Sequence, residues 1–166
     1  MNGRIEALAE VVSPSVLVDA IETSRRLTAL GVPHALIGGL AVGIHGYPRS
    51  TRGVDFLVGD EAFERKTAIL VYRAELVEIA KAGVIDLMSI PPLHEELRDL
   101  LAVPRGGEIP VMPAHGLVLL KLLVGRPQDL ADVHALLKVG VDVSAIRSYL
   151  GEHAPNLVPV LARLLP

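Results

Sequence analysis

Residues 37–58 read IGGLAVGIHGYPRSTRGVDFLV, and this stretch decides the predicted fold. It begins at the end of a short apolar run, His34–Ile37, which predicts a buried strand. The Gly-Gly pair at residues 38 and 39 predicts a tight turn, after which LAVGIHG starts a short helix. A second apolar run, Val54–Val58, predicts another buried strand. The stretch therefore predicts a strand, a glycine turn, a short helix, a basic loop and a strand that carries an acid.

The residue types in this stretch suit a bound phosphate. Gly38 and Gly39 carry no side chains, so a phosphate can approach their backbone amides closely. The helix that follows is expected to point its N-terminus toward the same place, which favours an anion. Arg49 offers a planar fork for phosphate oxygens, and Ser50 and Thr51 offer hydroxyl groups.

Asp55 adds a group of opposite charge near the start of the second strand. A carboxylate in that place can hold a divalent metal ion that bridges phosphates. An acid between apolar residues of a buried strand is costly unless it is paired or bound to a metal, which favours a site role over a salt bridge at the strand edge. The same reasoning applies to Asp86, which lies in the later apolar segment VIDLM.

The stretch from Gly38 to Val58 resembles the signature of the bacterial nucleotidyltransferase superfamily, in the branch that includes abortive-infection toxins and their uncharacterised relatives. The block LVLLKLLVGRPQDLADVHALL also resembles that branch, where a Lys-containing helix is followed by an Arg–Asp–Asp helix. The matched blocks cover residues 33–58 and 115–137, with a looser match at residues 84–88.

The resemblance implies roles for the matched residues. Asp55 and Asp86 become the catalytic acids and the Mg²⁺ ligands, and a nucleoside triphosphate (NTP) becomes the substrate. The expected nucleotide-binding residues are Gly38, Gly39, Arg49, Ser50, Thr51 and Lys121, while Arg126, Asp129 and Asp132 match the last helix. Gly53 departs from the pattern, because it stands where the family has the first of two acids on this strand. Losing one of three carboxylates weakens a two-metal site.

Simpler structural roles compete with these assignments. Gly38 and Gly39 also suit a plain strand-to-helix turn. The stem of Lys121 can extend from an apolar helix to solvent. Asp129 and Asp132 lie early in a helix, where acids suit the helix dipole, so a structural role is expected for both.

Histidine and cysteine give little sign of a second site. His45, on the short helix, is expected to be a hydrogen-bonded packing residue. His94, His115 and His134 show no metal-ligand spacing. The chain has no cysteine, which excludes disulfides, thiolate catalysis and Cys-based zinc sites.

The 166-residue length suits one compact domain with a small helical appendage, and 51% of the residues are hydrophobic. A net charge of −3 argues against nucleic-acid binding driven by charge alone. Residues 28–48 carry no formal charge over a length that spans a bilayer, but Pro33 and five glycines break the run, so no membrane association is expected. The N-terminus lacks the apolar stretch of a signal peptide, and a cytoplasmic location is expected.

The rest of the chain predicts an α+β fold. Ser13 and Pro14 predict a helix start with the Ser13 hydroxyl as a cap, and Gly31 ends that helix. Further strands are expected at residues 68–72, 75–79, 83–90 and 108–112, and further helices at 94–101, 114–125, 128–140 and 143–154, with a last helical turn or two in the tail. We expect a nucleotidyltransferase-like mixed sheet flanked by helices over residues 1–112, and a C-terminal helical bundle over residues 113–166.

Three functions compete as explanations of these features. The first is a magnesium-dependent nucleotidyltransferase that moves a nucleoside monophosphate from an NTP to an unknown acceptor. The second, favoured by Gly53, is a catalytically degenerate member that binds a nucleotide, an RNA or a protein partner, in a toxin–antitoxin setting. The third is a dinucleotide-binding unit, which is disfavoured because Gly38, Gly39 and Gly43 do not follow the G-x-G-x-x-G order. The acceptor, the base preference and the oligomeric state do not follow from the sequence.

Overall fold

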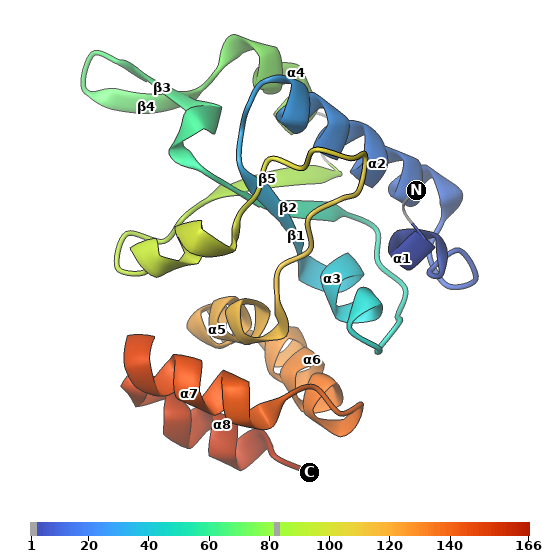
Figure 1. Ribbon diagram of the computed structural model, residues 1–166, viewed down its shortest axis with the longest axis vertical. Coiled ribbons are helices and arrows are strands. Elements are labelled where there is room, and N and C mark those ends of the chain that lie inside the picture. Colours follow the sequence, from blue (N-terminus) through green and yellow to red (C-terminus); the bar gives the residue numbers. More distant parts are fainter. Residues whose placement is uncertain (1–2, 82–83) are drawn as a thin grey trace.

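A three-stranded mixed sheet lies at the centre of the protein. The computed structural model describes residues 3–81 and 84–166 (Figure 1). The strands are β1 (His34–Ile37), β2 (Val54–Val58) and β5 (Ile85–Ser89), in the order β1-β2-β5. β1 runs antiparallel to β2, and β2 runs parallel to β5. The first two strands have the bounds that the apolar runs predict.

The two faces of this sheet bury different side chains. Side chains alternate along a strand, so Asp55 and Leu57 of β2 face one side while Val54, Phe56 and Val58 face the other. The face of Phe56 packs in one apolar cluster with Leu36 of β1 and with helices from the N-terminal half. The face of Leu57 packs in a second cluster with the C-terminal helices. Asp55 therefore points toward the C-terminal part of the chain.

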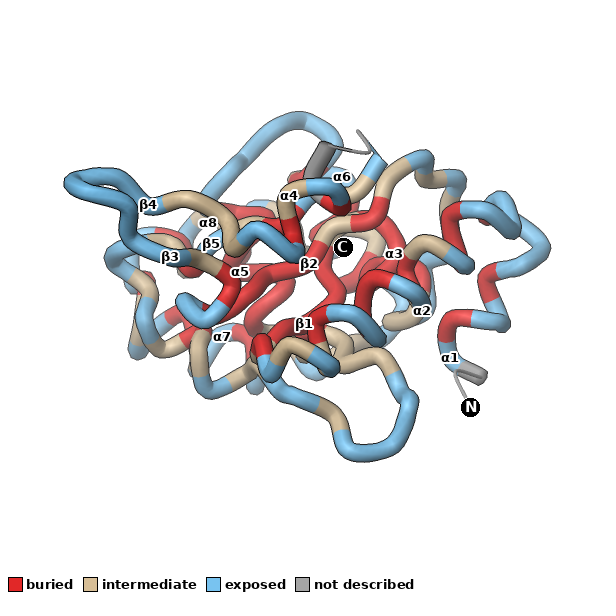
Figure 2. Tube along the Cα trace, turned by 90° about the horizontal axis from the view of Figure 1, so that it is seen from above, coloured by how far each residue is buried: buried red, intermediate tan, exposed pale blue. Residues whose placement is uncertain are grey.

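The N-terminal helices cover the Phe56 face of the sheet and one end of it. They are α1 (Gly3–Glu6), α2 (Pro14–Ala29), α3 (Gly38–Ile44) and α4 (Ala74–Lys81). In Figure 1, α2 and α4 lie on one side of the sheet and the C-terminal helices lie on the other. Figure 2 shows the buried residues gathered along the strands between these layers.

The C-terminal helices form a layer of their own. They are α5 (Ala114–Val124), α6 (Pro127–Lys138), α7 (Val143–His153), η3 (Pro155–Leu157) and α8 (Val158–Leu164). α5 is buried from Gly116 to Leu122, because it lies between the sheet and the later helices. The α+β class, the mixed sheet with flanking helices and the helical C-terminal region are thus confirmed. The expected domain boundary at residue 112 stays a prediction.

Some expected elements were wrong. Residues 75–79 form part of α4 rather than a strand, because Leu76 and Ile79 are buried one helical turn apart while Glu75 and Glu78 face solvent. Ser13 does not cap α2 with its side chain; its hydroxyl bonds to that of Ser15 instead. The glycine pair does not precede α3, because α3 begins at Gly38.

The expected edge strand at residues 108–112 is also not a regular strand. This segment runs along β1 and forms one isolated parallel bridge between Leu36 and Val111. The Leu36 amide donates to the Pro110 carbonyl, and the Met112 amide donates to the Leu36 carbonyl. Pro110 has no N–H of its own, so a continuous ladder is interrupted there.

A β-hairpin and two 3-10 turns connect the sheet to its surroundings. β3 (Phe63–Lys66) and β4 (Ile69–Tyr72) pair as a separate two-stranded sheet, of which the sequence predicted the second strand. The hairpin extends from the body of the protein, and its tip is exposed (Figures 1 and 2). The turns are η1 (Asp60–Ala62) and η2 (Glu95–Leu100), the latter within the expected helix at residues 94–101. Among the described helices, none combines the length and apolar character that crossing a membrane requires.

Candidate functional site

Asp55 and Asp86 are cross-strand neighbours. The parallel register of β2 and β5 places Asp55 opposite Asp86, and both side chains face the C-terminal helices. Asp55 is half-buried, whereas Asp86 is exposed. Burial raises the pKa of the Asp55 carboxyl above its usual range, the charge of Asp86 adds to this, and Lys121 is the first of the cations that oppose it. The structure thus brings together the two predicted acids as a pair of like charges.

Gly38 makes room for the acid pair. It adopts a left-handed backbone with φ of 67°, which side chains disfavour. A Cβ atom at this position would overlap the Oδ2 atom of Asp55. Position 38 is therefore glycine because a side chain there would collide with the Asp55 carboxylate. The same lack of a side chain leaves room for a phosphate.

Gly39, in α3, allows the loop that contains Arg49 and Thr51 to pack closely against this helix. A Cβ atom at this position would lie 2.9 Å from Thr51 Oγ1 and 3.2 Å from Arg49 Nη2. Arg49 and Thr51, which the sequence predicts to bind phosphate, thus pack directly against Gly39 near the start of α3. Ser50 is exposed, and its carbonyl accepts a hydrogen bond of 3.2 Å from Arg49 Nη1.

The acid pair opens into a pocket of about 320 Å³ between the sheet and the C-terminal helices. Its size falls at the lower end of the range typical of small-molecule sites. The pocket is lined by Ile37, Gly38, Asp55, Asp86, Met88, Pro91, Leu117, Leu120, Lys121, Leu123, Val124, Arg126 and Asp129. The lining combines five charged side chains with apolar ones, most of which come from α5.

Asp132 joins the basic loop to the C-terminal helices. Its side chain is fully buried, and it accepts from Arg49 through both oxygens, at 2.8 Å from Nε and 2.9 Å from Nη2. Lys121 Nζ donates to the same carboxylate at 2.7 Å, and Gln128 Nε2 donates to it at 2.9 Å. Burial by itself raises the pKa of Asp132, but these hydrogen bonds outweigh it and lower the pKa. Asp132 is therefore ionised and shared by two cations.

Asp129 forms a second ionic pair at the mouth of the pocket. Lys121 Nζ lies 3.4 Å from its Oδ1, and Arg126 Nε lies 2.8 Å from its Oδ2. The side chain of Arg126 is 72% exposed, whereas Lys121 is buried and its stem does not extend to solvent. The sequence predicts a structural role for Asp129 and Asp132 through the helix dipole. In the structure both form ion pairs with Lys121, and Asp132 also pairs with Arg49.

Gly53 lies beside β5 at the edge of the acid pair. A Cβ atom there would lie 3.3 Å from the carbonyl oxygen of Val84, which already accepts from the Val54 amide. An acid at position 53 would therefore have to fit beside this carbonyl oxygen. Within residues 3–81 and 84–166, no group of three or more acidic or histidine side chains is placed to hold a metal ion.

His45 and His34 are held in place by hydrogen bonds. His45 Nε2 lies 2.7 Å from the Met112 carbonyl, as expected for a packing residue. His34 is fully buried, between the Ser24 hydroxyl at 2.8 Å from Nε2 and the Val32 carbonyl at 2.8 Å from Nδ1. Burial lowers the pKa of His34, so its ring stays neutral and ties α2 to β1.

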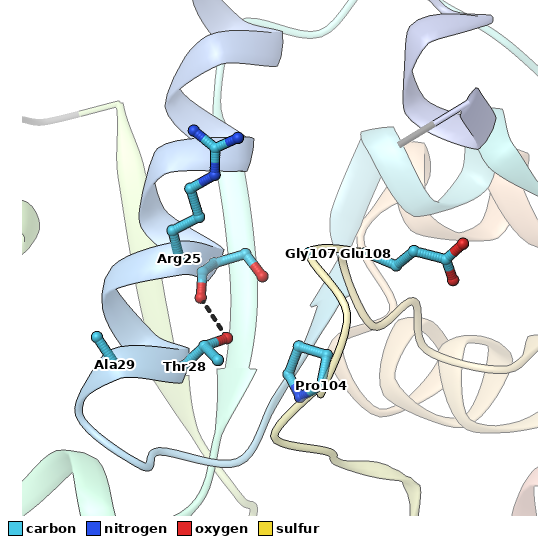
Figure 3. Close-up of a pocket in the computed structure, with 7 residues that line it drawn as sticks. Arg25, Thr28, Ala29, Pro104, Gly107 and Glu108 are labelled. Carbon is cyan, nitrogen blue, oxygen red and sulfur yellow. Dashed lines mark hydrogen bonds between the residues drawn. The ribbon is translucent and has the colours of Figure 1, made fainter. Parts of the chain in front are cut away.

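A second pocket of about 200 Å³ lies between α2 and the loop at residues 104–108 (Figure 3). Thr28 donates its hydroxyl to the Ser24 carbonyl at 2.8 Å, so this group is already satisfied. The charged ends of Arg25 and Glu108 point away from one another in Figure 3. No charged groups converge there as they do beside Asp55, so the acid-pair pocket is the stronger candidate site.

Comparison with known proteins gives matches among solved structures. No protein-family model and no curated protein sequence matches this chain. The chain is similar to the crystal structure of an antigenic nucleotidyltransferase-like protein from Paracoccidioides brasiliensis, at 16% sequence identity and a TM-score of 0.48. The match covers 92% of this chain and 94% of that chain. A similarity of this degree assigns neither a family nor an activity, so the functional argument rests on the residues of the pocket.

Proposed function

We propose that this protein binds a magnesium–NTP complex in the acid-pair pocket and transfers a nucleoside monophosphate from it to an acceptor. The observation that carries the proposal is the register of β2 and β5, which sets Asp55 beside Asp86 in a pocket that Lys121 and Arg126 also line. In the reaction, an acceptor hydroxyl attacks the α-phosphorus, the bond to the β-phosphate breaks and pyrophosphate leaves. The acceptor's proton is released to water.

The donor set fits a magnesium ion. Proteins bind Mg²⁺ through one or two carboxylates, together with substrate phosphates and water. Asp55 and Asp86 supply two carboxylates to this pocket. Burial and the charge of Asp86 both disfavour the ionised form of Asp55, and a cation between the two carboxylates relieves both effects. When bound, the ion supplies charge neutralisation on the phosphates and polarisation of the reacting group.

The chain's own cations suit the outer phosphates. Arg126 is mostly exposed at the mouth of the pocket, and its guanidinium carries donors beyond those directed at Asp129. Lys121 lines the pocket wall, where its charge acts on a bound anion although its nearest partners are Asp132 and Asp129. Arg49 is held by Asp132 and keeps Nη1 for a carbonyl. Arg49 would therefore act on a bound phosphate through its charge rather than through a hydrogen bond.

The proposal is tested by magnesium-dependent NTP binding and turnover. Wild-type protein is titrated with each NTP in the presence of Mg²⁺ by calorimetry, and pyrophosphate release is followed with RNA and protein mixtures as acceptors. Asp55→Asn and Asp86→Asn are expected to lower magnesium-dependent binding at least tenfold. Asp99→Asn, an exposed acid of η2 outside the pocket, is the control and is expected to match wild type. Binding that is equal in all four proteins contradicts the proposal.

A second candidate function is nucleotide binding without turnover. It is supported by Gly53, which stands where the resemblance expects an acid two residues before Asp55, and by Asp132 and Asp129, which occupy the nearest donors of Arg49 and Lys121. In this form the protein acts on an RNA or protein partner in the cytoplasm, in a toxin–antitoxin pair. Gly53→Asp discriminates between the two functions. Turnover that appears in Gly53→Asp and is absent from wild type favours binding alone, while equal turnover favours the transferase.

A further inference from the structure

We infer that the aliphatic wall of the acid-pair pocket holds the nucleobase and that it does not distinguish one base from another of the same size. This inference rests on the proposed function, because it takes the ligand to be an NTP whose phosphates lie at Asp55 and Asp86. It concerns the apolar residues of the same pocket lining.

The wall consists of six apolar residues from two parts of the fold. Leu117, Leu120, Leu123 and Val124 come from α5, and Met88 and Pro91 come from β5 and the segment after it. Leu123 and Val124 are 40% and 51% exposed, although aliphatic side chains of this size are mostly buried elsewhere in the protein. An exposed apolar surface that continues into a polar pocket is typical of a ligand site.

The nucleobase is the part of an NTP that this wall suits. The triphosphate carries the negative charge and belongs with magnesium and the cations at the acid pair. The sugar is polar on most of its edges. The base has flat faces of low polarity, and covering one of them with Leu120, Leu123 or Val124 removes apolar surface from water on both sides.

The wall offers no side chain that reads the edge of a base. The polar side chains that line the described pocket are Asp55, Asp86, Lys121, Arg126 and Asp129. The two acids of the pair lie on the sheet, Lys121 and Asp129 are bonded to each other, and the remaining donors of Arg126 are assigned to the outer phosphates. No amide or hydroxyl side chain is present in this lining.

Aliphatic contact discriminates by area and not by hydrogen-bonding pattern. A hydrophobic pocket rejects a polar variant of similar shape weakly, whereas a site built to hydrogen-bond a group rejects a ligand without it strongly. ATP and GTP are therefore expected to bind within about twofold of each other, and so are CTP and UTP. Purines are expected to bind severalfold more tightly than pyrimidines, because they cover more of the wall.

The experiment is a set of calorimetric titrations of the wild-type protein with ATP, GTP, CTP, UTP and inorganic tripolyphosphate, each with Mg²⁺. The same ligands are titrated into Val124→Ala and into Val18→Ala. Val18 is 61% exposed on α2 and supplies the same substitution outside the pocket. We expect Val124→Ala to weaken all four NTPs by a similar factor of about twofold to fivefold, with tripolyphosphate unchanged, and Val18→Ala to change none of them.

Each result separates this inference from the proposed function. A difference of more than tenfold between ATP and GTP, or between CTP and UTP, overturns the inference and leaves nucleotide binding intact. A shared preference for ATP and CTP would point to backbone carbonyls at the end of α5 accepting from the base amino group, and it also overturns the inference. Tripolyphosphate that binds as tightly as the NTPs shows that the base does not rest on the wall. If none of the ligands binds, the proposed function fails together with the inference.

Discussion

Arg49 and Asp132 meet in a two-point ion pair although 83 residues separate them in the chain. The fork of the guanidinium matches both carboxylate oxygens, and this geometry is the strongest that the two groups can form. Asp132 is fully buried and Arg49 is partly buried, so water competes poorly for either group. The pair connects the loop after α3 to α6 and thereby holds the C-terminal helices against the rim of the candidate site.

The first prediction concerns Asp132. Replacing it by Ala leaves Arg49 and the buried Lys121 without their shared partner, and losing one member of a buried pair typically costs about 3–5 kcal/mol. We expect Asp132→Ala to lower the free energy of unfolding by an amount in this range, measured by urea denaturation. Glu22→Ala breaks the exposed pair with Arg26 and is the control, with a change below about 1 kcal/mol. Similar losses in both variants would show that Asp132 is not a central partner.

The second prediction concerns Gly38. Gly31 and Gly38 have φ values of 68° and 67°, but a Cβ atom meets nothing within 4 Å at Gly31 and overlaps Asp55 at Gly38. Gly31→Ala is therefore expected to cost about 1–2 kcal/mol from backbone conformation alone. Gly38→Ala is expected to cost more and also to weaken magnesium-dependent NTP binding, because Asp55 must move. Equal stability of the two variants, by thermal denaturation, would show that the carboxylate yields without cost.

The third prediction concerns Asp55 and the stability of the ligand-free protein. Because its pKa is raised, the folded protein gives up this proton less readily than the unfolded chain, so the charged carboxylate opposes folding at neutral pH. Asp55→Asn should therefore have a higher melting temperature than wild type at pH 7 without magnesium. The advantage should shrink as the pH falls through the raised pKa and vanish below the ordinary value of 3.8. A melting temperature below that of wild type at pH 7 would mean that the carboxylate has a stabilising partner.

The fourth prediction concerns His34. Its pKa is lowered by burial, so the folded state takes up a proton later than the unfolded chain does on acidification. The contribution of His34 to stability is complete above the ordinary pKa of 6.5 and is lost as the pH falls from there toward the lowered value. We expect the urea midpoint of wild type to fall as the pH drops below 6.5, and to fall less in His34→Gln. Parallel pH profiles of the two proteins would assign the loss to other groups.

The sequence predicts the centre of the sheet well, because β1 and β2 are short apolar runs between strong turn formers. The helical C-terminal region is predicted equally well, since Pro127 and the Asp142 cap mark its helix starts and Asp142 does accept from the Ala145 amide. The prediction from the sequence fails at α4. In this short helix the apolar positions, which include the buried Leu76 and Ile79, fit a strand and a helix alike.

The site is predicted in part. Asp55 and Asp86 are candidates from the sequence because an acid inside an apolar strand is costly without a partner, and the parallel pairing of β2 and β5 sets them side by side. Their roles as catalytic acids and metal ligands stay predictions. The link from Arg49 through Asp132 to Lys121 was missed. Lys121, Asp129 and Asp132 are individually compatible with solvent exposure and helix-dipole effects, and only the packing of α5 and α6 against the loop shows that they share a buried cluster.

The connection between β2 and β5 is suited to the insertion of another domain. The chain between β2 and β5 includes the β3–β4 hairpin, whose tip at Thr67 is exposed and far along the sequence from both strand ends. Closing a longer loop costs only about 0.6 kcal/mol for each doubling of its length, and exposed hairpin tips tolerate insertions. A fluorescent or binding domain inserted at this tip is therefore expected to leave Asp55 and Asp86 in register.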